Sequence, residues 1–316
     1  MTREPEKSPY ADSLADEILE EIRRQMPFLY RATIHTPAVP IAERLPALEQ
    51  IARRLCAMNG GARDWIAPAV RSYIVLSLEF LKLQRQLEQT GRYLLSSERE
   101  AQERVYNNED VFGGYYLYGL LLSEALWPNH FTLNSHYRDH FLPSVRSDAH
   151  ILEAGVGTGY HLALLLEARP ACLYEGCDLS DYAIEFARRF AVAGAQKQTR
   201  TSIHKRNVMD GLPAADGTYD NIIMGEILEH VERPDRLLDE TYRVLRTGGT
   251  MYMTTVVFAA NIDHIYLFEH ADEIRRLVTS RRWTIEKDWV LPVYPSDSPN
   301  AAKRPMNYGS VLRKPL

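Results

Sequence analysis

The spacing of apolar residues divides the chain into a helical N-terminal part and an α/β remainder. Before residue 110 the apolar residues recur at helical spacing, and almost no strand pattern occurs. Between Leu14 and Met26, for example, an apolar residue stands at every fourth position and would lie on one helix face. Helices are therefore predicted over residues 13–30, 42–58, 64–89 and 97–106.

Residue types at the predicted helix ends support these limits. Gly91 would end the third helix, because glycine readily adopts the left-handed conformation found at helix C-termini. Ser97 and Glu100 have the spacing of a capping box at the start of the fourth. We expect residues 1–110 to form an all-helical cap, which serves either as a lid over a pocket or as the interface of a homodimer.

After residue 148, short β-rich runs alternate with helical stripes, which is the pattern of an α/β fold. Strands are predicted from residue 151 and over residues 173–177, 202–205, 219–225, 250–258, 283–291 and 307–312. Helices are predicted over residues 160–167 and 181–192, and Ser180 is expected to cap the second. A further helix is predicted to begin at Pro234 and to end at Gly248 and Gly249.

The first of these strands leads into a glycine-rich loop. Gly155, Gly157 and Gly159 stand at alternate positions between the strand and the next helix, whose free N–H groups would point at the loop. This arrangement is typical of a cofactor-binding loop. The G-x-G-x-G spacing differs from the G-x-G-x-x-G of dinucleotide-binding proteins, which disfavours a nicotinamide dehydrogenase.

With Glu153 two residues before the first glycine, the loop resembles the first motif of class I S-adenosylmethionine-dependent methyltransferases. In that family the loop holds the amino-acid end of the cofactor, and the acid acts through bridging contacts to its ammonium group. The resemblance covers residues 148–316 and implies a Rossmann-like fold with a mostly parallel, seven-stranded sheet. The alternative for the loop alone is a tight turn in another α/β protein.

Residues after the next two strands extend the resemblance. Asp178 follows Gly157 by 21 residues, the spacing at which a carboxylate can accept hydrogen bonds from a ribose diol. The alternative is that Asp178 helps to cap the following helix. Asn207 and Val208 look like the adenine-contacting segment of the family, which usually carries an aspartate near Asn207. Asparagine there can still hydrogen-bond the adenine amino group.

The end of the fourth strand carries the second informative pattern. Gly225 and Glu226 are expected to contact the cofactor, and Glu226, Glu229 and His230 form an E-x-x-E-H motif. If the chain is helical here, the three side chains of the motif face one way. Two carboxylates and an imidazole that converge on one pocket suit a divalent cation, magnesium or another.

The E-x-x-E-H motif is similar to that of the metal-dependent small-RNA 2′-O-methyltransferases and of the ubiquinone-pathway O-methyltransferases. The RNA enzymes add a histidine downstream, and His264 occupies a comparable place, with His270 as a second candidate. We expect Glu229 and His230 to be catalytic. Metal-independent methyltransferases also carry a similar short sequence motif at this place. Without a metal, His230 could act as a general base.

Aromatic residues and histidines are concentrated in the linker, residues 111–147. Related enzymes often use the segment before the glycine loop to close over the cofactor and the substrate. Tyr115, after a pair of glycines, is the expected cofactor contact, and Tyr116, Trp127 and His130 are the expected substrate contacts. The alternative is that each of these residues packs in the core of a hinge.

Composition narrows the choice of partner and compartment. The net charge of the 316 residues is −5 and no basic tail occurs, so a nucleic-acid partner is not favoured. Three cysteines without a C-x-x-C pattern argue against a disulfide framework. Residues 1–7 are polar and no run of 18 apolar residues occurs, so we expect a cytoplasmic protein that does not bind membranes.

The leading hypothesis is therefore a methyltransferase that uses S-adenosylmethionine to methylate a small molecule, with a divalent metal as a candidate second cofactor. Oxygen is the expected acceptor atom, and analogy places the reaction in secondary metabolism. The alternatives are an enzyme similar to the RNA 2′-O-methyltransferases and a protein that binds S-adenosylmethionine without catalysis.

Overall fold

The computed structural model describes residues 13–36, 38–193, 200–294 and 304–316. Its centre is a seven-stranded sheet with the strand order β3-β2-β1-β4-β5-β7-β6, in which β7 alone runs antiparallel to its neighbours. The strands are β1 (His150–Ala154), β2 (Leu173–Asp178), β3 (Arg200–Lys205), β4 (Tyr219–Gly225), β5 (Leu245–Val257), β6 (Thr284–Pro292) and β7 (Met306–Arg313). The predicted α/β fold with a mostly parallel sheet is confirmed.

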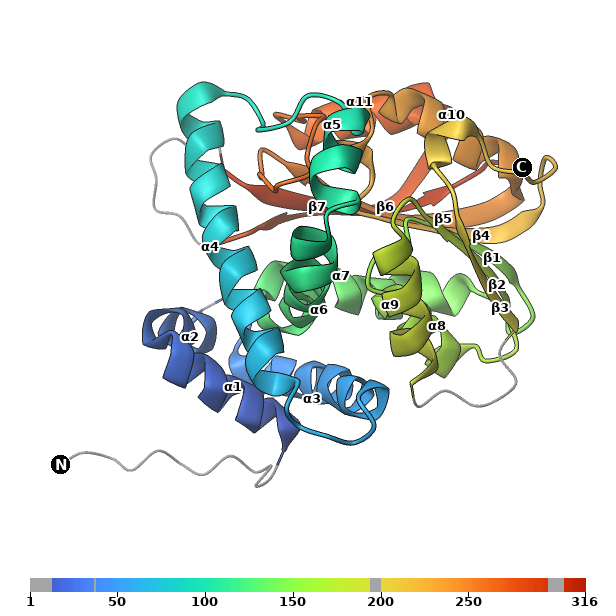
Figure 1. Cartoon of the computed structure of the whole chain (residues 1–316). Coiled ribbons are helices and arrows are strands. Elements are labelled where there is room, and N and C mark those ends of the chain that lie inside the picture. Colours follow the sequence, from blue (N-terminus) through green and yellow to red (C-terminus); the bar gives the residue numbers. More distant parts are fainter. Residues whose placement is uncertain (1–12, 37, 194–199, 295–303) are drawn as a thin grey trace.

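Helices cover both faces of the sheet, so the central strands are buried on both sides. One face is covered by α8 (Tyr160–Ala168) and α9 (Asp181–Val192), and the other by α10 (Pro234–Val244) and α11 (Ala271–Ser280) (Figure 1). Each face has its own hydrophobic core. Ile151 of β1 belongs to the first core, whereas the next residue, Leu152, belongs to the second, as the alternation along a strand requires.

The N-terminal part is helical, as predicted. Its helices are α1 (Leu14–Gln25), α2 (Pro27–Ile34), α3 (Ile41–Met58), α4 (Ile66–Thr90) and α5 (Glu98–Ala101), followed in the linker by α6 (Leu117–Leu126) and α7 (Pro128–His136). The π-helical turns η1 (Gln102–Tyr106), η2 (Glu109–Tyr116) and η3 (Tyr137–Phe141) join these elements. Gly91 ends α4 with a φ of +67°, which confirms its predicted role.

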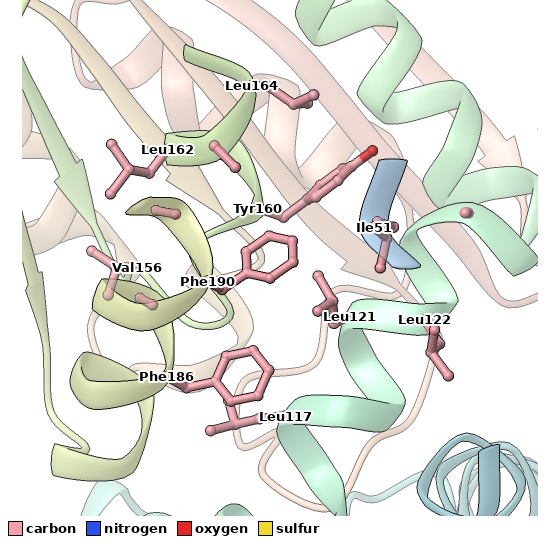
Figure 2. Close-up of a cluster of buried hydrophobic side chains, with 14 of the residues drawn as sticks. Ile51, Leu117, Leu121, Leu122, Val156, Tyr160, Leu162, Leu164, Phe186 and Phe190 are labelled. Carbon is pink, nitrogen blue, oxygen red and sulfur yellow. The ribbon is translucent and has the colours of Figure 1, made fainter. Parts of the chain in front are cut away.

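The helical part shares a core with the α8–α9 face. Ile51 of α3 and Leu121 of α6 lie in the same cluster as Tyr160 of α8 and Phe190 of α9 (Figure 2). Helix α4 crosses the edge of the sheet and contributes Leu87 to the opposite core (Figure 1). The helices therefore have fixed positions relative to the sheet.

A buried arginine adds polar contacts to this junction. Arg54 of α3 donates hydrogen bonds to the backbone oxygens of Ala191 and Ala193, at distances of 3.0 and 2.8 Å, and pairs with Glu167 of α8. The C-terminus of α9 has free carbonyl groups, which a cation satisfies well. Arg54 thus joins α3 to both α8 and α9.

Two predicted element limits are wrong. The helix predicted over residues 13–30 is broken at Met26, because the proline ring of Pro27 lacks the N–H that would continue the helix. Gly248 and Gly249 do not end α10, which stops at Val244. They lie inside β5, where Gly248 has a φ of +76° in the irregular start of the strand. The two glycines were predicted to end the helix, but this part of the chain belongs to the strand that pairs with β4.

Two predicted caps also differ in detail. The hydroxyl of Ser97 caps α5, but the carboxylate of Glu100 accepts its bond from the N–H of Ser96 and not from that of Ser97. Ser180 makes no side-chain cap for α9, because its hydroxyl donates to the backbone oxygen of Tyr106 at 3.1 Å. This contact joins η1 to the loop after β2.

None of the helices that the structure describes is both long and apolar enough to cross a membrane. The three cysteines are free, and Cys172 and Cys177 are buried. The polar residues 1–7, on which the expectation of no signal peptide rests, lie outside the described residues.

Replacing Arg54 by alanine should lower the free energy of unfolding by about 2 to 4 kcal/mol, because buried carbonyl groups lose a charged donor. Denaturant unfolding followed by circular dichroism measures the effect. The matched control is Arg53→Ala, one residue away, whose side chain is 74% exposed and pairs with Glu49. Its stability should remain close to that of the wild type. Equal stability of the two variants would contradict this role of Arg54.

Candidate active site

A cavity of about 230 Å³ opens at the carboxyl ends of the central strands. Strand order reverses between β1 and β4, and in open α/β sheets ligands bind at such a switch point. The sheet side of the cavity is lined by Glu153, Gly155, Gly157, Asp178, Asn207, Val208, Gly225 and Glu226. Helices and turns of the N-terminal part line the opposite side.

The three loop glycines have different roles, although all have positive φ angles. A Cβ atom at Gly155 would lie 2.1 Å from Cδ1 of Ile227, so Gly155 packs against the turn after β4. A Cβ atom at Gly157 would meet nothing within 4 Å, and Gly157 faces the cavity. Gly159, a predicted cofactor contact, does not line the cavity. A Cβ atom there would lie 2.9 Å from Cα of Ala187, so Gly159 lets α8 approach α9.

Asp178 holds the glycine loop in place. Its Oδ2 accepts a hydrogen bond from the N–H of Gly157 at 3.0 Å, and its Oδ1 accepts one from the N–H of Ser180 at 2.9 Å. Burial raises the pKa of Asp178 above its ordinary value. Each carboxylate oxygen keeps a second lone pair, so Asp178 can still accept hydrogen bonds from a ligand diol.

Two further predicted cofactor residues lie on the same wall. Glu153 is buried, accepts a hydrogen bond from the hydroxyl of Tyr174 and lies 3.7 Å from Nδ1 of His161. Oδ1 of Asn207 accepts a bond from the N–H of Met209 at 2.9 Å. Its amide nitrogen has no hydrogen-bond partner among the described residues, so both ends of this amide can still serve a ligand.

The chain after β4 is not the helix that the E-x-x-E-H argument assumed. Glu226 has a φ of +53°, Ile227 is also non-helical, and only Leu228–His230 form a 3₁₀ turn. A positive φ is uncommon for glutamate and costs free energy. The N–H of Glu226 donates to both the backbone oxygen and the hydroxyl of Thr254, each at 3.0 Å, and these bonds hold the conformation.

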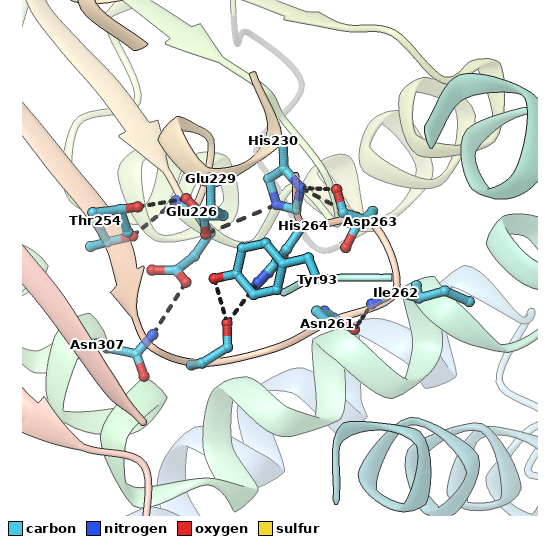
Figure 3. A network of polar contacts seen from close by, with 12 residues as sticks. Tyr93, Glu226, Glu229, His230, Thr254, Asn261, Ile262, Asp263, His264 and Asn307 are labelled. Carbon is cyan, nitrogen blue, oxygen red and sulfur yellow. Dashed lines mark hydrogen bonds and ion pairs between the residues drawn. The ribbon is translucent and has the colours of Figure 1, made fainter. Parts of the chain in front are cut away.

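Glu229, His230 and His264 nevertheless converge (Figure 3). One possible ligand atom from each residue lies within 4.8 Å of the others. Oε2 of Glu229 accepts a hydrogen bond from the hydroxyl of Thr255 at 2.7 Å. Its Oε1 is buried, has no hydrogen-bond partner among the described residues and lies 3.9 Å from Nε2 of His230.

Backbone carbonyls orient both imidazole rings. Nδ1 of His230 lies 3.1 Å from the backbone oxygen of Asp263, and Nδ1 of His264 lies 2.9 Å from that of Ala259 (Figure 3). Because a carbonyl can only accept, each Nδ1 must carry the proton, which leaves Nε2 with a lone pair. This is the tautomer of metal-ligating histidines, whose other nitrogen donates to a carbonyl or carboxylate.

The two rings differ in charge preference. Burial, assisted by the charge of His230, lowers the pKa of His264, so this ring is neutral. Burial also disfavours a charge on His230, but the carboxylates of Asp263 and Glu229 outweigh it and raise the pKa of His230. The cluster therefore attracts positive charge.

Glu226 completes this side of the cavity. Its Oε2 accepts a hydrogen bond from Nδ2 of Asn307 at 3.2 Å, whereas Oε1 is buried and has no partner among the described residues. Burial, and next the neighbouring Glu229, raise the pKa of Glu226 well above its ordinary value. The raised pKa lets Glu226 keep a proton beside the carboxylate of Glu229 when no cation is bound, and the same pair of adjacent carboxyl groups fits a divalent metal that displaces this proton.

The linker supplies the opposite wall. Tyr116, Trp127 and His130 line the cavity as predicted, but Tyr115 does not. The hydroxyl of Tyr115, the expected cofactor contact, donates to Glu79 of α4, away from the cavity lining. Neighbouring side chains in a helical turn point in different directions. Here Tyr116, and not Tyr115, faces the cavity.

Sequence reasoning missed two asparagines. Nδ2 of Asn129, in α7, donates to Oδ1 of Asn307, in β7, at 2.7 Å, and Asn307 in turn donates to Glu226. Both asparagines are buried and line the cavity. The available signal was a polar residue at a buried position of a predicted strand, which is uncommon unless the residue has hydrogen-bond partners.

Comparisons with known proteins agree with this geometry. Residues 152–253 match the family described as "Methyltransferase domain". The demethylmenaquinone methyltransferase of Symbiobacterium thermophilum is 35% identical over 125 residues, which are 39% of this chain and 45% of that protein. The mitochondrial ubiquinone biosynthesis O-methyltransferase of Candida albicans is 27% identical over 139 residues, which are 43% of this chain and 41% of that protein.

A solved structure shows a similar fold. It is phosphoethanolamine N-methyltransferase 2 of Haemonchus contortus in complex with S-adenosyl-L-methionine. The similarity has a TM-score of 0.53 at 13% identity and covers 71% of this chain and 61% of that one. The chain spans less than half the length of the two curated relatives above.

The different roles of the loop glycines can be tested by stability. Gly159→Ala should lower the free energy of unfolding by about 2 to 4 kcal/mol, because its Cβ overlaps the backbone of α9 in addition to the cost of a positive φ. At Gly157 the added Cβ has open space, so Gly157→Ala should lower the free energy of unfolding only by the cost of a positive φ, about 1 kcal/mol. Denaturant unfolding without ligand measures both variants. Equal losses would refute the packing role of Gly159.

Proposed function

We propose that this chain, which carries a class I S-adenosylmethionine-dependent methyltransferase domain, transfers a methyl group to an oxygen atom of a small molecule with the help of a divalent cation. The domain, its Rossmann-like fold and S-adenosylmethionine as its cofactor rest on the family match and on the fold. The acceptor, the metal and the activity of the whole chain belong to the proposal.

One observation carries the metal part of the proposal. The unpartnered Oε1 of Glu229 is buried, and the ligand atoms of Glu229, His230 and His264 lie within 4.8 Å of one another, whereas the second unpartnered carboxyl oxygen, that of Glu226, stands outside this group. The Nδ1 protons of both imidazole rings are already used by carbonyl groups. Glu229, His230 and His264, with Glu226 next to them, would hold the cation through carboxylate oxygens and imidazole nitrogens. When bound, such an ion orients an acceptor oxygen and lowers its pKa.

The residues of the chain perform the other tasks. The open side of Gly157 and the lone pairs of Asp178 bind and orient the cofactor, so that the reaction occurs within one preformed complex. Tyr116 and Trp127 cover the cavity and exclude water. In the absence of metal, Nε2 of His230 carries the lone pair that would accept a proton from the acceptor hydroxyl.

A small acceptor is favoured over a nucleic acid. The cavity is covered by the N-terminal helices and lined by apolar and aromatic residues, and the net charge of the chain is −5. The names of the two curated relatives, demethylmenaquinone methyltransferase and ubiquinone biosynthesis O-methyltransferase, also refer to small molecules. Oxygen is preferred as the acceptor atom because oxygen is the ligand that hard cations bind best.

Metal binding can be measured without activity. Addition of Mn²⁺ or Mg²⁺ in large excess over its dissociation constant should raise the melting temperature of the wild type by several degrees, and His264→Ala should lose this shift. The matched control is His270→Ala. His270 is exposed at the start of α11, outside the cluster, so the shift should persist. A shift that His264→Ala retains would exclude the proposed site.

Activity can be tested without knowledge of the acceptor. The purified chain would be incubated with methyl-labelled S-adenosylmethionine and a host-cell extract, with and without EDTA, and the label would be separated into small-molecule, RNA and protein fractions. We expect label in the small-molecule fraction that EDTA abolishes. EDTA-resistant label would remove the metal from the proposal, and label in RNA would overturn the choice of acceptor. Binding of S-adenosylmethionine without transfer would favour a non-catalytic role.

A further inference from the structure

The cavity carries a second polar cluster, formed by Glu124 of α6 and by His130 and Asn134 of α7. We propose that these three residues form a subsite for an ammonium group. The inference rests on the proposed function, because it concerns a ligand of the same cavity. His130 was an expected substrate contact, whereas Glu124 and Asn134 were not singled out by their sequence context.

Glu124 lines the cavity without a cation partner. Oε2 accepts a hydrogen bond from Nδ2 of Asn134 at 2.7 Å, and Asn134 is itself buried. Across the described part of the chain, no lysine, arginine or histidine forms an ion pair with Glu124, and Oε1 accepts no hydrogen bond there. A carboxylate that faces an apolar cavity gains most from a cationic hydrogen-bond donor.

His130 contributes a second acceptor. The hydroxyl of Ser123 donates to the backbone oxygen of Leu120 at 2.6 Å. It can therefore only accept from Nδ1 of His130, which lies 3.0 Å away, and Nε2 is left with the lone pair. Burial lowers the pKa of His130, so the ring is neutral near pH 7. The imidazole thus faces the cavity as a hydrogen-bond acceptor.

The amide of Asn134 supplies the third acceptor. Because Nδ2 donates to Glu124, Oδ1 remains, and no described residue donates a hydrogen bond to it. One negative charge and three acceptors match a group with one positive charge and three N–H donors. A hydroxyl has only one donor. Divalent metals are less favoured here, because the subsite has fewer ionic ligands than the cluster around Glu229.

The position of Glu124 favours one source of the ammonium group. Glu124 and Tyr160 line the same cavity, and the charge of Glu124, after burial, raises the pKa of Tyr160. Tyr160 is the first residue of α8, directly after the glycine loop. The loop is expected to hold the amino-acid end of S-adenosylmethionine, so the α-ammonium of the cofactor is the preferred occupant. An amine on the acceptor has the same chemistry.

Calorimetric titration of the full chain tests the subsite. S-adenosylhomocysteine carries the α-ammonium, and 5′-methylthioadenosine lacks the whole amino-acid end. Glu124→Gln should bind S-adenosylhomocysteine about 10- to 100-fold more weakly than the wild type, since a charged hydrogen bond is lost. Its affinity for 5′-methylthioadenosine should be unchanged, which also shows that the variant is folded. The control Glu79→Gln, whose carboxylate binds Tyr115 outside the cavity, should bind both ligands normally.

A second titration distinguishes the ammonium group of the cofactor from an amine on the acceptor. If Glu124→Gln keeps its affinity for S-adenosylhomocysteine, phenethylamine and phenethyl alcohol are titrated into the protein saturated with S-adenosylhomocysteine. Loss of amine binding in Glu124→Gln alone would assign the subsite to the acceptor. If neither S-adenosylhomocysteine nor the amine distinguishes Glu124→Gln from the wild type, the subsite is refuted. A wild type that does not bind S-adenosylhomocysteine would instead overturn the proposed function.

Discussion

The site depends on the burial of two adjacent carboxylates at the end of β4. Removing Glu226 and Glu229 from water costs free energy that only hydrogen bonds and positive charge can offset. Threonines of β5, Asn307 of β7 and two imidazole rings supply part of this compensation, and one oxygen of each carboxylate remains unpartnered. A proton kept by Glu226, or a divalent cation that displaces it, offsets the remaining cost.

The same requirement connects the sheet to the helical part. Asn129 of α7 orients Asn307, which orients Glu226, so a side chain of the linker acts on the carboxylates through a strand. Such a chain of contacts works only if the helices are held firmly. The shared hydrophobic core and Arg54 provide that rigidity, because both join the N-terminal helices to α8 and α9. The helical part is thus a structural wall of the cavity.

The cavity combines two electrostatic environments. The carboxylates and histidines around Glu229 favour a cation, and Glu124, elsewhere in the cavity lining, supplies a separate negative charge. Asp178 and the glycine loop lie on the sheet wall of the same cavity. A cofactor with a positive sulfonium and an ammonium group would bind favourably in such a cavity, because an interior of low dielectric strengthens each charge interaction.

The sequence by itself determined the strands and the glycine loop, and it named Asp178, Glu229, His230 and His264 as candidates, whereas the structure brought the last three together without the predicted helix. Strand and loop signals are local, and they place residues at strand ends whatever packs around them. Only the tertiary structure decided the positive φ of Glu226, the packing role of Gly159 and the outward position of Tyr115. It also decided the Asn129–Asn307 pair, whose members are 178 residues apart. These features depend on contacts between distant segments, and no local pattern encodes such contacts.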